Sequence, residues 1–110
     1  MGDEEVAMRP WRVAVSGHSM EPALREGDWV LVLPQRRPRE GDVVLVRDPR
    51  DSRLLLKRVA QIGPEGCVVI GDRREHSTDS RVFGEVPFDH VIGRAVLRYA
   101  PLRRFGRPRG

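Results

Sequence analysis

The sequence contains a single cysteine, Cys67, among its 110 residues. One thiol excludes an intramolecular disulfide. The residues that follow it, Val68, Val69 and Ile70, favour a β-strand. We therefore expect Cys67 to be buried and unreactive.

Long hydrophobic runs are also missing. No stretch approaches the roughly 20 apolar residues that a membrane-spanning helix needs. Residues 1–12 are acidic and polar, without the apolar run of a signal peptide. These absences predict a cytoplasmic protein.

The chain is short and moderately basic. With 110 residues and 39% hydrophobic content, it has room for one modest core. We expect a mobile N-terminus over residues 1–10, one domain over 11–100 and a basic tail over 101–110. The net charge of +4 comes mainly from that tail. No zinc-ligand spacing, aromatic ladder or helix-turn-helix pattern accompanies it, so no nucleic-acid partner is predicted. A weak contact of the tail with a membrane surface is the remaining option.

Lysine is as scarce as cysteine. Of the 20 lysine and arginine residues, 19 are arginine and one is Lys57. Arginine does not lose its proton in proteins, whereas a desolvated lysine can be neutral and act as a base. Lys57 is therefore a candidate general base. An exposed strand lysine in a chain with arginine-biased composition explains the count equally well.

The candidate partner of Lys57 is Ser19, in the turn that begins at Ser16 and Gly17. A serine hydroxyl is a weak nucleophile at neutral pH and needs a base to take its proton. Serine in a turn is ordinary when taken alone. The prediction of a nucleophile therefore depends on Ser19 and Lys57 together.

Runs rich in valine and leucine predict a mainly β fold in a single small domain. The expected strands cover residues 11–15, 29–33, 43–46, 54–60, 67–70 and 90–97, with a short helical turn over 19–25 after the nucleophile. The runs 29–33 and 43–46 are expected to pair with each other. Both are apolar at successive positions, which predicts burial on two faces, as in a folded-over or barrel-like antiparallel sheet.

Lys57 lies on an apolar face of its expected strand. Alternation places Leu55, Lys57 and Val59 on the same side. Desolvation by such neighbours lowers the pKa of an amine, which is the direction that a general base requires.

Residues 71–87 form a long polar connection, and its length in so small a domain suggests a function. Asp79 and Arg81 are expected to pair and brace it, which leaves the Ser77 hydroxyl to hold the lysine amine. An ordinary surface loop is the alternative.

Four motifs occur in a fixed order along the chain. They are Ser16-Gly17-His18-Ser19-Met20-Glu21-Pro22-Ala23-Leu24, Gly41-Asp42-Val43-Val44, Leu56-Lys57-Arg58-Val59, and Gly71-Asp72 followed by Ser77-x-Asp79-Ser80-Arg81-x-Phe83-Gly84-x-Val86-Pro87. Together they resemble the motifs of type I signal peptidases over residues 13–96. The resemblance implies a barrel-like antiparallel sheet and a serine endopeptidase with a Ser/Lys dyad. Ser19 would be the nucleophile and Lys57 the general base, with no metal or cofactor.

The resemblance also implies supporting roles. Ser77 would orient Lys57, Asp79 and Arg81 would support the loop, and the Ser19 N–H would help to form the oxyanion hole. Gly17 stands where some members have a serine that aids this hole. The precursor substrate would bind as an extended N-terminal segment beside the strand that precedes Lys57. Shallow pockets for its side chains would be lined by Val15, Met20, Leu24, Leu55 and Leu56.

Two departures from the family pattern narrow the expected function. Type I signal peptidases usually carry an N-terminal membrane anchor, which this chain lacks, and Arg73 replaces the asparagine usual after Gly71-Asp72. A short member without an anchor resembles the maturation proteases of nickel-type superoxide dismutase. We therefore expect removal of an N-terminal propeptide from a soluble precursor, nickel superoxide dismutase in particular.

Other classes of function stay open. An ordinary signal peptidase could act peripherally at the membrane, and a non-catalytic binding module could dock an acidic partner on the basic tail. Self-cleaving repressor-type proteases share the Ser/Lys chemistry but lack the pattern of residues 71–87. A serine/histidine mechanism would use His18, His76 or His90. Cleavage of a propeptide separates an enzyme from a binding module.

Overall fold

The computed structural model describes residues 11–34, 37–51, 53–73 and 78–108, which form one antiparallel sheet with short helical segments. The mainly β fold is confirmed. The strands are β1 (Trp11–Ala14), β2 (Trp29–Pro34), β3 (Val43–Arg47), β4 (Leu54–Ile62), β5 (Gly66–Ile70), β6 (Val86–Pro87) and β7 (Val91–Ala100). The helical segments are α2 (Ser80–Phe83) and the 3-10 turns η2 (Phe88–His90) and η3 (Leu102–Arg104).

The strand order is β1-β2-β7-β3-β4-β5-β6, and every neighbouring pair is antiparallel. The predicted pairing of run 29–33 with run 43–46 is therefore wrong, because β7 lies between β2 and β3. With ten residues, β7 is long enough to pair with β2 along one edge and with β3 along the other. Two apolar runs close in sequence thus become central strands of one sheet rather than the arms of a hairpin.

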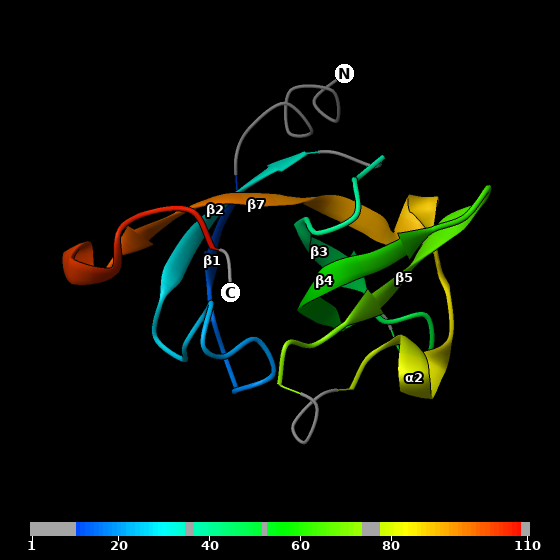
Figure 1. Ribbon diagram of the computed structural model, residues 1–110, viewed down its shortest axis with the longest axis horizontal. Coiled ribbons are helices and arrows are strands. Elements are labelled where there is room, and N and C mark those ends of the chain that lie inside the picture. The colour runs from blue at the N-terminus through cyan, green and yellow to red at the C-terminus, as the bar shows by residue number, and fades with distance from the viewer. Residues whose placement is uncertain (1–10, 35–36, 52, 74–77, 109–110) are drawn as a thin grey trace.

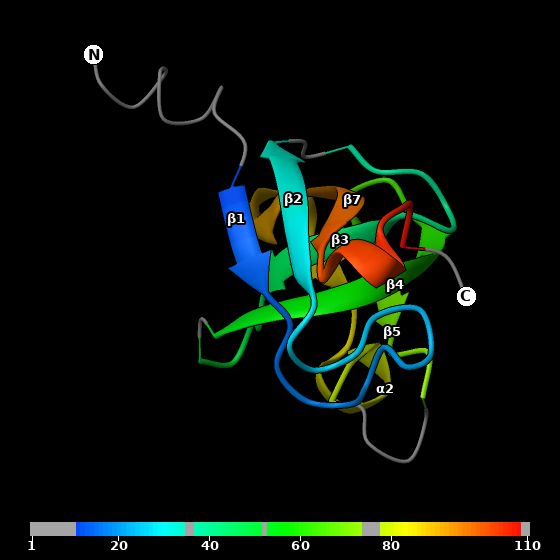
Figure 2. The same cartoon turned by 90° about the vertical axis from the view of Figure 1, so that its left-hand side faces the viewer.

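The sheet curls into a half-barrel. Figure 1 shows β7 running across the molecule, with β1 and β2 on one side and β3, β4 and β5 on the other. In the view turned by 90°, β1 and β2 lie in front of the sheet that β3 and β4 continue (Figure 2). The curl brings β1 opposite the first half of β4, and side chains from both strands line one cavity.

The central strand β3 separates two hydrophobic cores. Val43 and Leu45 pack with buried residues of β2 and of the β1–β2 loop. Val44 and Val46 point the other way and pack with residues of β4, β5 and β7. The prediction of burial on both faces is thus confirmed for run 43–46, but it is wrong for run 29–33, where Val30 and Val32 are buried while Trp29 and Leu33 are exposed. Each fully buried valine or leucine contributes roughly 1.5–3 kcal/mol to folding, so β3 stabilises both halves of the sheet.

Gly93 is required where β2 and β3 flank β7. It pairs with Pro34 on one side and with Leu45 on the other. A Cβ atom at this position would lie 2.3 Å from the carbonyl oxygen of Leu33. A residue with a side chain would therefore force the strands apart at the crossing that joins the two halves.

The connection from residue 71 to residue 87 contains more structure than the sequence suggested, because α2 and β6 lie within it. Asp79 caps α2, accepting a hydrogen bond from the Arg81 N–H at 3.0 Å. Strand β6 pairs with β5 through Val86, which is fully buried. Cys67 on β5 is also buried, as expected, and burial raises the pKa of its thiol to about 11.

Part of the basic C-terminal stretch folds back onto the domain. Arg104 donates from Nε and Nη2 to the carboxylate of Asp28, with distances of 3.0 Å, and the Asp28 side chain is almost fully buried. Arg98 donates to the carbonyl oxygen of Ala23 at 2.6 Å and to that of Arg104. Within the described ranges no helix is long and apolar enough to cross a bilayer. The expected mobile segment, residues 1–10, lies outside the described residues.

Candidate active site

Ser19 lies on a loop between β1 and β2 whose two ends are tied together. The Val15 N–H donates to the Asp28 carbonyl at 2.8 Å, and the Gly27 N–H donates to the Val15 carbonyl at 3.0 Å. Met20 and Leu24 fill the inside of the loop and are almost fully buried. The predicted helical turn is a single one, closed by a 2.9 Å bond from the Leu24 N–H to the Met20 carbonyl. Because Met20 and Leu24 anchor the loop to the core, Ser19 is held at the loop surface.

Gly17 gives the loop its bend just before Ser19. Its φ is +84°, in the left-handed region, where a side chain is strained. The space around it is open, so the requirement for glycine comes from the backbone and not from crowding. The Ser19 N–H has no hydrogen-bond partner among the described residues. A free N–H beside a nucleophilic oxygen is what an oxyanion hole uses.

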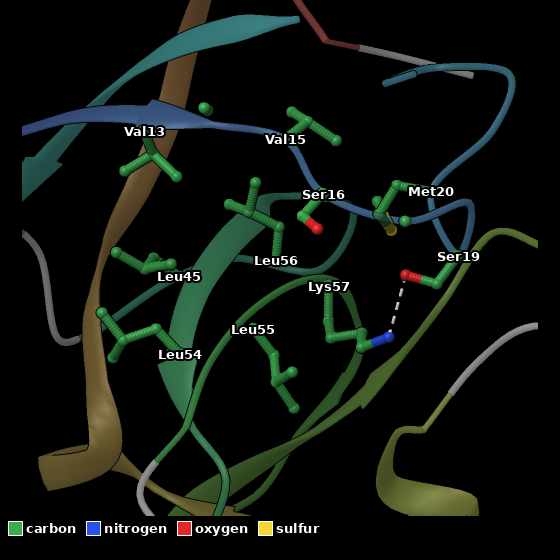
Figure 3. Close-up of a pocket in the computed structure, with 12 residues that line it drawn as sticks. Val13, Val15, Ser16, Ser19, Met20, Leu45, Leu54, Leu55, Leu56 and Lys57 are labelled. Atoms are coloured by element: carbon green, nitrogen blue, oxygen red, sulfur yellow. Dashed lines mark hydrogen bonds between the residues drawn. The ribbon is translucent and has the colours of Figure 1, made fainter. Parts of the chain in front are cut away.

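Lys57 comes from β4, where it pairs with Val44 of β3. Its side chain is 3% exposed. Nζ donates to the Ser19 Oγ at 3.0 Å across 38 residues of sequence. Figure 3 shows the two side chains meeting at one end of the cavity. A hydroxyl and an amine at this distance are within reach of proton transfer.

The electrostatic environment favours the neutral form of Lys57. Burial lowers the pKa of its amine below the ordinary lysine value. The negative charge of Asp79 opposes this shift, and the positive charge of Arg81 adds to it. A lowered pKa increases the fraction of neutral amine at physiological pH, which is the form that can accept a proton.

Asp79 and Arg81 pair as predicted. The Arg81 guanidinium donates from Nε at 3.0 Å and from Nη2 at 2.5 Å to the Asp79 carboxylate, which also accepts the Gly71 N–H at 2.7 Å. Burial raises the pKa of Asp79, but these hydrogen bonds outweigh it and hold the pKa below the ordinary value. The charged Asp79 thus ties the end of β5 to α2. Ser77, the predicted partner of Lys57, lies outside the described residues.

Arg73 ties the opposite side of the site to the Ser19 loop, a contact that no sequence pattern predicts. Its N–H donates to the Ser19 carbonyl at 2.7 Å, and its Nη1 donates to Glu21 at 2.6 Å. Glu21 also contacts His18 Nδ1 at 2.6 Å. Hydrogen bonding with His18 is the main cause that lowers the pKa of Glu21. Arg73, which departs from the expected motif, therefore holds the Ser19 loop in place.

The cavity beside Ser19 has a volume of about 260 Å³. Apolar side chains of β1 and β4 form most of its wall (Figure 3). Four of the five predicted pocket residues line it: Val15, Met20, Leu55 and Leu56. The fifth, Leu24, is fully buried in the core and does not line the cavity. Additional lining residues are Val13, Ala14, Ser16, Leu45 and Leu54. The sequence could have suggested Val13 and Leu54, which flank the predicted residues in alternation.

Two strand edges border this cavity. β1 pairs only with β2, and β4 pairs with β5 only from Arg58 onward, within the described part of the chain. The first residues of β4, from Leu54 to Leu56, therefore pair with β3 on one edge and have no described partner on the other. An unpaired edge offers N–H and C=O groups to an extended peptide.

The histidines do not offer an alternative base for Ser19 in the described structure. His18 contacts Glu21 and Glu26, and His90 lies by the Arg47 carbonyl and Asp89. His76 lies outside the described residues. Among those that are described, no group of histidine, cysteine, aspartate or glutamate side chains is arranged to hold a metal ion.

Comparison with known proteins identifies related sequences. A family model described as Peptidase S24-like matches residues 11–78, and one described as signal peptidase, peptidase S26, matches residues 60–100. Mitochondrial ATP-independent inner membrane protease subunit 1a of Arabidopsis thaliana is 39% identical, over 84% of this chain and 71% of its own length. Human mitochondrial inner membrane protease subunit 1 is 31% identical, over 86% and 72%. Probable signal peptidase I-1 of Synechocystis is 31% identical, over 96% and 57%.

These names overturn the predicted location. Two of the relatives are named for the mitochondrial inner membrane, and a further one, 35% identical over 69% of this chain, is the thylakoidal processing peptidase 1 of Arabidopsis thaliana. The prediction of a cytoplasmic protein is therefore wrong. That prediction relied on the absence of an apolar run, and such an absence does not exclude action at a membrane surface.

Proposed function

The chain belongs to the S24/S26 family of signal peptidase-like serine proteases, and we propose that it cleaves precursor proteins with Ser19 as nucleophile and Lys57 as general base. The contact that carries the proposal is the 3.0 Å hydrogen bond between Lys57 Nζ and Ser19 Oγ, made by a lysine that is 3% exposed. A buried lysine next to a serine hydroxyl is the arrangement that nucleophilic catalysis without histidine requires.

The reaction proceeds in two half-reactions. Neutral Lys57 takes the proton of Ser19 while Oγ attacks the scissile carbonyl, and the resulting oxyanion accepts the Ser19 N–H. The Lys57 ammonium then gives its proton to the leaving amine as the peptide bond breaks, which leaves an acyl-enzyme. Lys57 next deprotonates a water molecule that attacks the ester. Return of the proton to Ser19 Oγ releases the carboxyl product and restores the dyad.

The neighbouring residues keep the dyad in position. Arg81 neutralises the charge of Asp79, so that Asp79 stabilises the Lys57 ammonium less than an unpaired carboxylate would. Asp79 also accepts the N–H groups of Gly71 and Arg81, and we propose that Ser77 orients Lys57. Gly17 permits the bend that leaves the Ser19 N–H free to donate.

We propose that the substrate binds as an extended segment between β1 and the first half of β4. The unpaired edges of both strands border the cavity and can add the substrate to the sheet. An extended peptide turns alternate side chains toward the wall. Because that wall is mainly apolar and the cavity holds only about 260 Å³, the preferred side chains just before the cleaved bond are small or apolar.

The relatives support a substrate presented at a membrane. They are named as inner membrane proteases and as a signal peptidase, which favours the processing of N-terminal segments at a membrane surface. Removal of a propeptide from nickel superoxide dismutase stays a prediction, since none of the relatives named above is described as acting on that protein.

The test is cleavage of two precursors by the purified protein. One is a secretory preprotein inserted into lipid vesicles, and the other is a soluble nickel superoxide dismutase precursor. New N-termini are mapped by mass spectrometry, with Ser19→Ala as the control. Cleavage of the vesicle-bound preprotein after small apolar residues, lost in the control, supports a membrane-surface peptidase. Cleavage of the soluble precursor alone supports the maturation function instead. No new terminus from either precursor contradicts the proposed activity.

A further inference from the structure

A second hollow, of about 400 Å³, lies away from Ser19 and shares no lining residue with the first cavity. Its wall is formed by the turn before β3, the middle of β4, the middle of β7 and the C-terminal segment. Arg58, Arg94 and Arg107 reach it from three of these elements. The proposed protease mechanism uses none of the three.

Arg58 is a fixed part of this wall. It donates to both carboxylate oxygens of Asp72, from Nε at 2.8 Å and from Nη2 at 2.9 Å, and from Nη1 to the Gly41 carbonyl at 2.9 Å. Both side chains of the ion pair are mostly buried. Arg58 and Asp72 therefore cancel in charge, and they hold one side of the hollow rigid.

Arg94 and Arg107 are not satisfied in the same way. Arg94 approaches a carboxylate only loosely, with Nη1 3.9 Å from Asp42 Oδ1. Its Nε is buried and has no hydrogen-bond partner among the described residues. The exposed Arg107 has no described partner either. A buried donor without an acceptor is costly, so Arg94 is less well satisfied by the protein than Arg58 is.

The charge balance of the hollow favours an anion as its ligand. Once the Arg58–Asp72 pair is set aside, two guanidinium groups face one carboxylate, Asp42, which already accepts the Arg39 N–H at 2.8 Å. The surplus is positive. The planar guanidinium fork matches the oxygens of a phosphate group, which can accept the exposed Nη donors of Arg94 and the donors of Arg107.

We propose that this hollow binds a phosphate group through Arg94 and Arg107. The group belongs either to a phospholipid head or to a soluble phosphate. Other arginines of the same C-terminal stretch are occupied within the chain, since Arg104 binds Asp28 and Arg98 binds the Ala23 carbonyl. Among the described C-terminal residues, Arg107 is therefore the arginine that lines the hollow without a described partner.

The experiment compares three arginine-to-glutamine variants of equal net charge. Arg94→Gln and Arg107→Gln remove the two free donors, and Arg103→Gln removes an exposed arginine of the same stretch that does not line the hollow. Inorganic phosphate is titrated into each protein by calorimetry. Arg94→Gln and Arg107→Gln are each expected to weaken phosphate binding about fivefold, as the loss of one arginine contact implies. Arg103→Gln should bind as the parent does.

Binding to phosphatidylcholine vesicles with and without phosphatidylglycerol identifies the source of the phosphate. If Arg94→Gln and Arg107→Gln also weaken binding to the anionic vesicles, the lipid head is the ligand, and if only phosphate binding weakens, the ligand is soluble. Equal phosphate affinities in all three variants, or no phosphate binding by the parent, would overturn the proposal. Arg107 is exposed and outside the sheet, so Arg107→Gln tests the site even if Arg94→Gln disturbs β7.

Discussion

Replacing Lys57 by methionine and by arginine separates its two properties, length and the ability to lose a proton. Methionine has a similar length and volume but nothing to protonate. Arginine keeps a permanent positive charge. If Lys57 is the general base, both variants lose activity, but only the arginine variant should lose much stability.

The burial of Lys57 sets the size of these effects. The side chain is 3% exposed, and burial already lowers the pKa of the amine. Methionine fills nearly the same space, so the free energy of unfolding should change by less than about 1.5 kcal/mol. Arginine places an obligate charge where Asp79 is already paired with Arg81. An unpaired buried charge costs roughly 3–5 kcal/mol, which lowers the melting temperature by more than about 10 °C in a domain of this size.

Turnover of a precursor peptide is measured beside thermal unfolding for Lys57→Met, Lys57→Arg, Ser19→Ala and the double variant Ser19→Ala/Lys57→Met. Loss of a general base lowers the rate by about 10²- to 10⁴-fold. Because the two residues act as one unit, the double variant should be no slower than Ser19→Ala. A folded Lys57→Met protein that cleaves within about tenfold of the parent rate would refute the dyad, since the expected loss is larger.

Three further outcomes are expected. The cleavage rate should rise with pH through the pKa of Lys57, which burial lowers, because only the neutral amine takes a proton. Loss of activity on replacing His18, His76 or His90, with Lys57→Arg tolerated, would indicate a histidine base instead. Glu21→Gln and Arg73→Gln should each lower kcat about two- to fivefold with little change in KM, as for a half-exposed ion pair that positions the Ser19 loop; failure of the exchanged pair Glu21→Arg/Arg73→Glu to recover kcat would show that the pair is not needed. Arg104→Gln, which leaves Asp28 charged and buried, should lower the free energy of unfolding by roughly 3–5 kcal/mol, and Asp28→Asn by less; equal chemical denaturation midpoints would contradict this.

The local features of the fold could be predicted from the sequence, but their long-range arrangement could not. Strand positions follow from apolar runs and glycine turns. Burial on both faces does not follow from an unbroken apolar pattern alone, because run 43–46 is buried on both faces whereas the equally apolar run 29–33 exposes Trp29 and Leu33. The insertion of β7 between β2 and β3 has no local signal, since partner choice depends on which strands the curled sheet brings together. Gly93 was the available hint, because a glycine inside a strand often marks a close approach of backbones.

In the candidate site, too, local features could be predicted and long-range contacts could not. Ser19 and Lys57 could be proposed from residue chemistry, since one lysine among many arginines is unusual. The Asp79–Arg81 pair could be proposed because its members are two residues apart at a helix start. The Arg73 contact with Glu21 spans 52 residues, and Leu24 looked like a pocket residue because only packing shows that it faces the core. The chemical type of a residue can be read from the sequence. The direction in which a loop side chain points depends on how it packs against the core, which the sequence does not show.

The central position of β7 also determines when this protein can become active during its synthesis. Ser19 follows β1, and Lys57 lies on β4, in the two parts of the sheet that β7 joins by pairing with β2 and β3. Until residues 91–100 have left the ribosome, the strand pairing that joins those parts is missing, although both residues of the proposed dyad were made long before. The nucleophile and its base should therefore meet late and in one cooperative step. A nascent chain that stops before Val91 would carry every proposed catalytic group and still be unable to cut.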